Sequence, residues 1–211
     1  SLEIQIPLRD AVGAARSYNN MGYIYRRRKD NRRALEVYGN VEELLKQEDN
    51  PELCDARIRL ASAFLEMGEM DRARDHAMTA FEETEGQMDI VHARARAVIG
   101  RYYAKAKENE LAMQYYSGAL DILSDQTDPH SAVEVAMLLG QVLSDAGRKE
   151  EAAEHYVDAM VLAEANDFRM LQGELLARLG EVESDRSQKM DYLQRSLTVF
   201  RDLGAVDRML E

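Results

Sequence analysis

The stretch YNNMGYIYRRRKDNRRALEVYGNV, Tyr18–Val41, contains the pattern that the rest of the chain repeats. In each half of it, apolar and small residues recur at spacings of three and four, which places them on one face of a helix. These residues are Tyr18, Met21, Gly22 and Tyr25 in the first half, and Ala34, Tyr38 and Val41 in the second. The polar run between the halves predicts a turn. The stretch is therefore a predicted helical hairpin.

The small residue of the first helix recurs at intervals of 39 or 40 residues, as Gly22, Ala61, Gly100, Gly140 and Gly180. In four copies alanine follows twelve residues later, as Ala34, Ala73, Ala112 and Ala152. A small residue lets two helices approach closely, within about 8–10 Å. A single hairpin cannot bury its apolar face alone, so the copies are expected to stack on one another.

The pattern predicts ten helices, at about 8–28, 31–47, 51–67, 71–85, 89–106, 109–125, 129–146, 149–166, 168–184 and 187–203. Asn50-Pro51 and Asp128-Pro129 are typical of an N-cap followed by proline at the first helical position. Gly68 and Gly147 are expected to end helices.

The fifth copy departs from the pattern at Glu183 and Tyr192, and aligning Ser196–Phe200 with Gly118–Ile122 restores its second helix. Residues 207–211, DRMLE, resemble the start of another helix.

This pattern of residues resembles the tetratricopeptide repeat (TPR), in a branch whose repeat is longer than the usual 34 residues. The resemblance implies an all-α, right-handed α-solenoid of about five hairpins in a single domain, 1–211. The repeats would be about 8–47, 51–85, 89–125, 129–166 and 168–204, with 205–211 beginning a further or capping helix. The family's first helices line a concave groove.

The family's pattern also predicts which residues face that groove. They are Arg16, Asn19, Tyr23, Arg26, Ile58, Ser62, Arg94, Arg101, Lys105, Met137 and Gln141. The groove would be basic near the first and third copies and acidic near the fourth and fifth. Arg16, Arg94 and Arg101 would hold the carboxylates of an acidic peptide. Alternatively, these arginines pair with Asp55 and Glu66 on the neighbouring helix.

A subset of the family grips a terminal carboxylate with lysine, asparagine and arginine residues. The matching positions here hold Asn19, Tyr23, Arg59, Arg94 and Val98, so that the basic character survives only at Arg94. Capture of a chaperone tail by this clamp is therefore not expected.

Charge is unevenly distributed over a chain whose net charge is −12. Residues 1–106 hold 17 Lys/Arg and 18 Asp/Glu, and residues 107–211 hold 10 and 21. This acidic excess argues against general nucleic-acid binding.

Apolar stretches are shorter than the roughly 20 residues that cross a bilayer, so no membrane contact is expected. With Cys54 the sole cysteine, a reducing, cytoplasmic location is the expectation. The start at Ser1 rather than methionine is compatible with a fragment of a longer protein.

Catalytic and metal-binding motifs are not recognisable in the sequence. The four histidines lack a partner at ligand spacing, and no phosphate-binding glycine loop or nucleophile elbow occurs. The run Arg26–Arg33, RRRKDNRR, is open to two interpretations, a phosphate-binding or nuclear-localisation patch and a set of cations at a helix C-terminus. The second is preferred, and no cofactor is predicted.

The sequence thus predicts a non-enzymatic protein-interaction module that binds a peptide or helix of a partner, with an acidic segment as one form of ligand. The alternative is the ligand- or peptide-sensing regulatory region of a larger signalling protein or transcription regulator. Self-association is a further expectation for the exposed ends of such a stack.

Overall fold

The computed structural model describes residues 8–45, 50–86, 89–124 and 128–204. Within these ranges the chain forms helices and no strand. Their bounds are α1 Leu8–Arg27, α2 Asn31–Leu45, α3 Pro51–Met67, α4 Met70–Glu83, α5 Ile90–Lys105, α6 Asn109–Ser124, α7 Pro129–Asp145, α8 Lys149–Ala165, α9 Arg169–Val182 and α10 Arg186–Asp202. The all-α repeat solenoid expected from the 39–40-residue pattern is confirmed, and every helix ends within two residues of its predicted bounds wherever the chain is described.

The predicted caps form as expected. The Asn50 side chain accepts a hydrogen bond from the Glu52 backbone N–H, 2.9 Å away, at the start of α3. Asp128 likewise accepts from the Ser131 N–H at 3.1 Å before α7. Gly68 adopts φ +80° and donates its N–H to the Leu65 and Phe64 carbonyl oxygens after α3. These local signals explain why the boundaries follow the sequence so closely.

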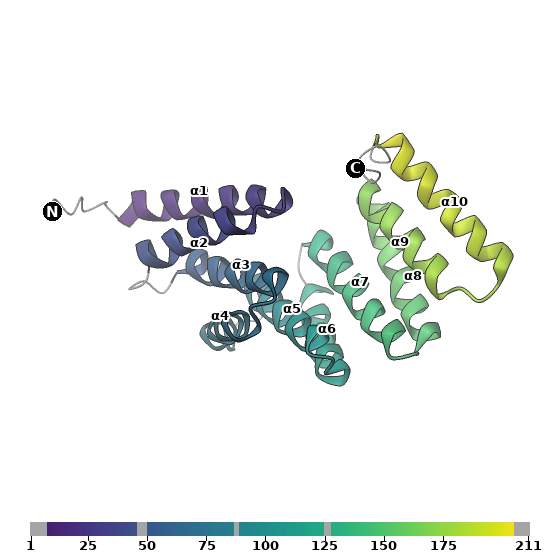
Figure 1. Cartoon of the computed structure of the whole chain (residues 1–211), viewed down its shortest axis with the longest axis horizontal. Coiled ribbons are helices and arrows are strands. Elements are labelled where there is room, and N and C mark those ends of the chain that lie inside the picture. The colour runs from purple at the N-terminus through teal and green to yellow at the C-terminus, as the bar shows by residue number, and fades with distance from the viewer. Residues whose placement is uncertain (1–7, 46–49, 87–88, 125–127, 205–211) are drawn as a thin grey trace. The chain divides into compact units, whose positions relative to one another are not determined.

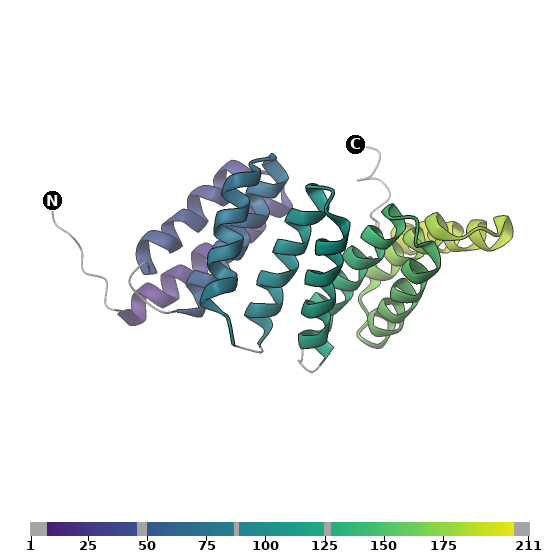
Figure 2. The ribbon, with the colours of Figure 1, turned by 90° about the horizontal axis from the view of Figure 1, so that it is seen from below.

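The helices group into two compact units, residues 1–102 and 103–211, each described here by itself. In the first unit α1 pairs with α2 and α3 with α4, and α1 also contacts α3. In the second unit α7 pairs with α8 and α9 with α10, and α7 also contacts α9. Figures 1 and 2 show these pairs as helical hairpins. The first helices of neighbouring hairpins therefore lie beside one another within each unit.

One contact between a glycine and a tyrosine holds a hairpin together in both units. A Cβ atom built on Gly22 of α1 would overlap the ring of Tyr38 on α2. In the same way, a Cβ on Gly140 of α7 would overlap the ring of Tyr156 on α8. Both tyrosines are fully buried. The small residue and the large residue sixteen positions later are thus the two halves of one close helix contact.

The last hairpin achieves its close contact at a different place. The nearest atoms to a Cβ on Gly180 belong to Leu193, at 3.0 Å, whereas a Cβ on Gly173 would lie 2.8 Å from Cε1 of Phe200. The Ser196 hydroxyl donates to the Gly173 carbonyl oxygen at 2.7 Å. The realigned second helix is confirmed as α10, but its contact with α9 is centred two turns before Gly180. The expected helix at 207–211 lies outside the described residues.

A transmembrane helix is not found in the part of the chain that the structure describes, because none of its helices is both long and apolar enough to cross a bilayer.

Candidate functional site

The predicted groove residues lie on the first helices, but their exposure differs widely. In the first unit Arg16 and Tyr23 are exposed, whereas Asn19, Ile58 and Ser62 are buried, with at most 7% of their surface accessible. Arg26, Arg94 and Arg101 are partly exposed. In the second unit Lys105 is exposed, and Met137 and Gln141 are partly exposed. The buried three therefore support the surface, and the arginines and Tyr23 form it.

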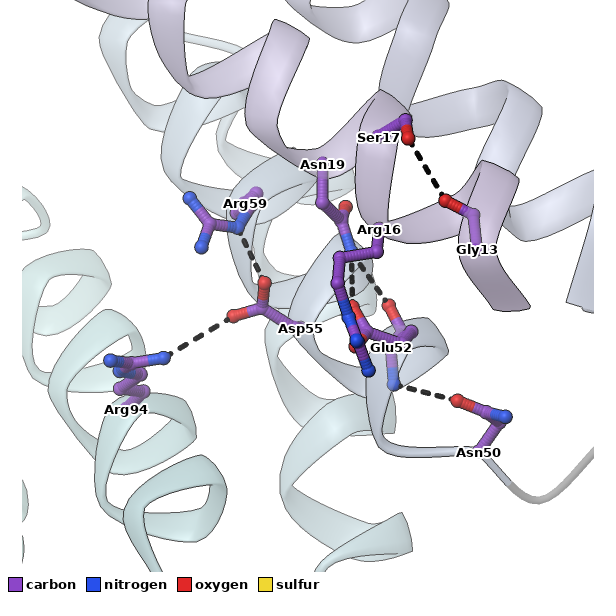
Figure 3. A network of polar contacts seen from close by, with 9 residues as sticks. All are labelled: Gly13, Arg16, Ser17, Asn19, Asn50, Glu52, Asp55, Arg59 and Arg94. Atoms are coloured by element: carbon purple, nitrogen blue, oxygen red, sulfur yellow. Dashed lines mark hydrogen bonds and ion pairs between the residues drawn. The ribbon is translucent and has the colours of Figure 1, made fainter.

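The carboxylate of Asp55 on α3 lies between two arginines (Figure 3). Its Oδ2 is 2.6 Å from Nε of Arg59, one turn along the same helix, and its Oδ1 is 3.7 Å from Nη1 of Arg94 on α5. The Arg59 guanidinium also lies over the Tyr23 ring of α1, 5.8 Å from its centroid. Asp55 and Arg59 together link the three first helices of the unit.

Glu66, three turns further along α3, is placed in the same way. Its Oε1 is 3.2 Å from Nη2 of Arg26 on α1 and 3.7 Å from Nη2 of Arg101 on α5. All three side chains are about one-quarter to one-third exposed. The Nε of Arg26 is buried, with no hydrogen-bond partner among the described residues. A ligand oxygen that reached this position would gain a donor that is otherwise unpaired.

Glu52 forms the third acidic position, at the start of α3. Its Oε1 pairs with Nε of Arg16 at 3.0 Å, and its backbone carbonyl accepts from Nδ2 of Asn19 at 3.1 Å. The Oδ1 atom of Asn19 is buried without a described partner. Asn19 therefore has one unused acceptor in the interior of this surface.

We call the surface formed by Arg16, Tyr23 and Arg26 of α1, Glu52, Asp55, Arg59 and Glu66 of α3, and Arg94 and Arg101 of α5 the α1–α3–α5 face. Five arginines stand there against three carboxylates, an excess of two positive charges. The pairing of Arg94 with Asp55 and of Arg101 with Glu66, the alternative left open by the sequence, is present in the structure. Because the arginines outnumber the acids, this pairing neutralises the face only in part.

The corresponding surface of the second unit has the opposite balance. We call the surface made by Glu134, Met137, Gln141 and Asp145 of α7 with Glu174, Arg178 and Glu181 of α9 the α7–α9 face. Arg178 donates to the amide oxygen of Gln141, and its Nη1 lies 3.5 Å from the Glu181 carboxylate. Burial, opposed by Arg178 and reinforced by Glu134, raises the pKa of Glu174. Four carboxylates here face one arginine, so this surface disfavours acidic ligands.

Both faces contain an arginine beside a buried tyrosine. Arg59 and Arg178 each lie two residues before the small residue of their first helix, near Tyr38 and Tyr156 respectively. Burial raises the pKa of Tyr156 to about 12, although the positive charge of Arg178 opposes the shift. Burial also raises the pKa of Tyr38, against the opposing charge of Arg59. Both phenols therefore stay protonated at physiological pH.

Arg59 is the functional candidate that the groove pattern missed. The family's positions place Ile58 and Ser62 in the groove, but Ile58 is 7% exposed while Arg59 reaches across to Tyr23 and Asp55. One signal was available, because Asp55 and Arg59 are four residues apart and such pairs meet on a helix surface.

The basic run Arg26–Arg33 is the tip of the first hairpin. Arg26 and Arg27 occupy the last turn of α1, where the helix dipole favours cations. Lys29 has φ +60° in the turn, and the Asp30 carboxylate accepts from the Arg33 N–H at 3.2 Å to start α2. Apart from Arg26, its basic side chains are exposed. Among the described residues, no group of three or more His, Cys, Asp or Glu is placed to hold a metal ion.

Comparison with known proteins agrees with this geometry. A family model described as tetratricopeptide repeat matches residues 15–44. No curated protein sequence matches the chain. BtubC (BKLC) from P. vanneervenii is similar in structure, with 14% identity and a TM-score of 0.73 over 93% of this chain and 90% of that one.

Two further similar structures are complexes. A Rap protein complexed with Competence and Sporulation Factor is 15% identical, with a TM-score of 0.77 over 87% of this chain and 53% of that one. Bacillus thuringiensis PlcR in complex with the peptide PapR7 and DNA is 15% identical, with a TM-score of 0.77 over 92% of this chain and 72% of that one. The chain thus spans about half of that Rap protein. These similarities establish the fold, an all-α helical-repeat solenoid like that of tetratricopeptide-repeat proteins.

Proposed function

We propose that this helical-repeat solenoid is a non-catalytic interaction module whose α1–α3–α5 face binds an acidic segment of a partner peptide or helix. The observation that carries the proposal is the excess of arginines over carboxylates on that face, formed by three neighbouring first helices. Arginine suits the role because its planar guanidinium pairs with a carboxylate through two parallel hydrogen bonds.

The spacing of the arginines suggests which spacing of acidic side chains in the ligand they would bind. Arg94 and Arg101 are seven residues apart on α5, which is about 10.5 Å along a helix. Two acidic side chains three residues apart in an extended peptide, or seven apart in a helix, are separated by a similar distance. Each arginine already shares one carboxylate of α3, so a ligand carboxylate would join or replace Asp55 and Glu66. An exposed ion pair contributes only about 0–1 kcal/mol, so binding needs several such contacts at once.

The test is affinity capture of partners from native extract with the wild-type chain and with Arg94→Glu/Arg101→Glu. The matched control is Arg186→Glu/Arg201→Glu, which makes the same change of charge at exposed positions of α10. A partner lost on the first double variant and kept on the control supports the proposal. A partner retained by both variants would place the binding surface elsewhere, and a partner lost on both would mean that overall charge, not the α1–α3–α5 face, governs binding.

A second candidate function is the sensor region of a larger regulatory protein. It is favoured by the structural likeness to the Rap protein complexed with Competence and Sporulation Factor and to PlcR in complex with the peptide PapR7, both of which extend beyond the matched region. Thermal stability measured against peptide-free pools of small molecules separates the candidates. A ligand that binds only the folded state at 100 times its dissociation constant adds about 2.7 kcal/mol, a readily detected shift. A sensor gives such a shift with a small ligand, and an adaptor gives none.

A further inference from the structure

The second unit has a groove on a surface separate from its α7–α9 face. It has a volume of about 430 Å³ and is lined by α6 and α8, the second helices of two hairpins, with part of α7 as its floor. Leu139 and Leu143 of α7 line it, whereas Met137 and Gln141 are offset by two residues and point to the opposite side of that helix. The groove therefore lies apart from every surface that the proposed function uses.

The lining of this groove has two parts with different chemistry. Its floor is apolar, formed by the buried side chains of Met113, Leu139 and Leu143. Its rim carries the carboxylates of Glu110, Asp121 and Glu151. An apolar floor with an acidic rim fits a long cationic side chain, because the aliphatic stem covers the floor while the charged head reaches the rim.

The groove already holds one side chain in this arrangement. Arg148 places Nη1 3.4 Å from the Met113 sulfur, and its Nε and Nη2 donate to the two carboxylate oxygens of Glu151 at 2.7 and 2.6 Å. Arg148 and Glu151 therefore neutralise each other. Counted by formal charge, the lining holds three carboxylates, those of Glu110, Asp121 and Glu151, against the one arginine, so its balance is negative.

The complementary surface on this chain is the tip of the first hairpin. Arg27, Arg28, Lys29, Arg32 and Arg33 are exposed there around one acidic residue, Asp30. The groove is too small for a whole helix but offers room for the long side chains of such a tip. The contrast extends to the halves of the chain, since residues 1–106 carry a charge of −1 and residues 107–211 carry −11.

We propose that the groove between α6 and α8 is a docking site for the Arg27–Arg33 tip of a second copy of this chain. Stems of tip arginines lie over Leu139 and Leu143, and their guanidinium groups pair with Glu110 and Asp121. The contact joins two different surfaces, so it is head-to-tail and each added copy presents a fresh groove. Association therefore gives a ladder of masses that grows with concentration. It weakens with salt, because the Debye length falls from about 30 Å at 0.01 M to about 3 Å at 1 M.

The test is sedimentation velocity of the full chain over a range of concentrations at low and high ionic strength. One variant, Arg27→Glu/Arg28→Glu/Arg32→Glu, changes the charge of the tip from +4 to −2. Another, Glu110→Lys/Asp121→Lys, reverses the charge of the groove. Each variant alone has like charges on both surfaces and should sediment as a monomer. An equimolar mixture pairs each reversed surface with a complementary one and should recover the mass distribution of the wild type. Circular dichroism of each variant checks that it remains folded.

The matched control is Glu154→Lys/Asp158→Lys, which makes the same charge change at exposed positions of α8 outside the groove lining. It should keep the association of the wild type. Four results would each overturn the proposal: a wild type that stays monomeric at low salt, single variants that associate like the wild type, a mixture that stays monomeric, and a control that loses association. None of these results bears on ligand binding at the α1–α3–α5 face.

Discussion

The two units are built on the same glycine–tyrosine contact but differ in the residue four positions before the small residue of each first helix. In the first unit these positions hold Tyr18 in the first copy and the charged residues Arg57 and Arg96 in the next two. In the second unit they hold the buried apolar residues Ala136 and Leu176. Arg57, only 14% exposed, pairs with Glu42 on α2 and with Glu83 on α4. Arg96 donates to His92 within α5 at 3.1 Å. At these positions the first unit thus links neighbouring helices through a charged group, Arg57, whereas the second unit relies on apolar packing.

This difference shows which positions of the repeat are free to vary. The close helix contact needs its small residue, because a Cβ there would overlap the ring of a fully buried tyrosine in a closely packed interior. The positions around it accept either charge or apolar bulk. The charges of the α1–α3–α5 and α7–α9 faces likewise differ although the hairpins match.

The largest expected effect tests what the units share. Gly22→Ala and Gly140→Ala each place a methyl group into a tyrosine ring, and each should lower the free energy of unfolding by about 3 kcal/mol, the upper part of the range for overpacking. Chemical denaturation measures the change. Gly13→Ala in α1 is the control, because nothing lies within 4 Å of its Cβ, and it should be neutral or slightly stabilising. Equal stability of Gly13→Ala and Gly22→Ala would contradict the shared contact.

The next effect tests what the units do not share. Arg57→Met should cost about 2 kcal/mol in the free energy of unfolding, because it leaves two carboxylates of neighbouring helices without their shared guanidinium. Urea denaturation compares it with Arg74→Met. The Arg74 side chain is 52% exposed and, among the described residues, its ion pair is with the adjacent Asp75, so this change should alter stability by less than about 1 kcal/mol. An Arg57→Met variant as stable as Arg74→Met would show that apolar packing alone holds both units.

A smaller effect concerns the pH dependence of the first unit. His92 is buried, its Nδ1 lies 2.9 Å from the Thr84 hydroxyl, and its Nε2 accepts from Arg96. Burial, reinforced by the positive charge of Arg96, lowers the pKa of His92 below 6.5. The folded state therefore binds fewer protons than the unfolded state, and the contribution of His92 to stability is complete above pH 6.5 and is lost as the pH falls below that value.

An NMR titration of the His92 ring protons measures this directly. The ring should stay neutral at pH values where an unperturbed histidine is already protonated, so its midpoint should lie below 6.5. A midpoint at or above that value would mean that Arg96 does not donate to Nε2. In the second unit Glu174 gives the opposite pH dependence. Because its pKa is raised above 4.5, the folded state binds more protons than the unfolded state above that pH. Its contribution to stability is therefore complete below pH 4.5 and is lost as the pH rises through the raised pKa.

Most of the fold was predictable because helix length, cap and close contact are all local or strictly periodic signals. Asn50-Pro51, Gly68 and the Gly22–Tyr38 pair illustrate each of these. The Gly173–Phe200 contact was missed because the last hairpin shifts its crossing point, and spacing alone does not reveal a shift. Arg59 and the groove between α6 and α8 were missed for a related reason. Both depend on where long side chains extend from neighbouring helices, which a residue pattern does not encode.

The most direct test of the central claim is a ¹H–¹⁵N NMR titration with a synthetic hexaglutamate peptide. Binding at the α1–α3–α5 face predicts shift changes concentrated on α1, α3 and α5, absent from α7 and α9, and lost in Arg94→Glu/Arg101→Glu. The changes should grow in Glu66→Gln, because removing that carboxylate removes one competitor of the ligand for Arg26 and Arg101. Shift changes centred on the α7–α9 face, or none at peptide excess, would contradict the account.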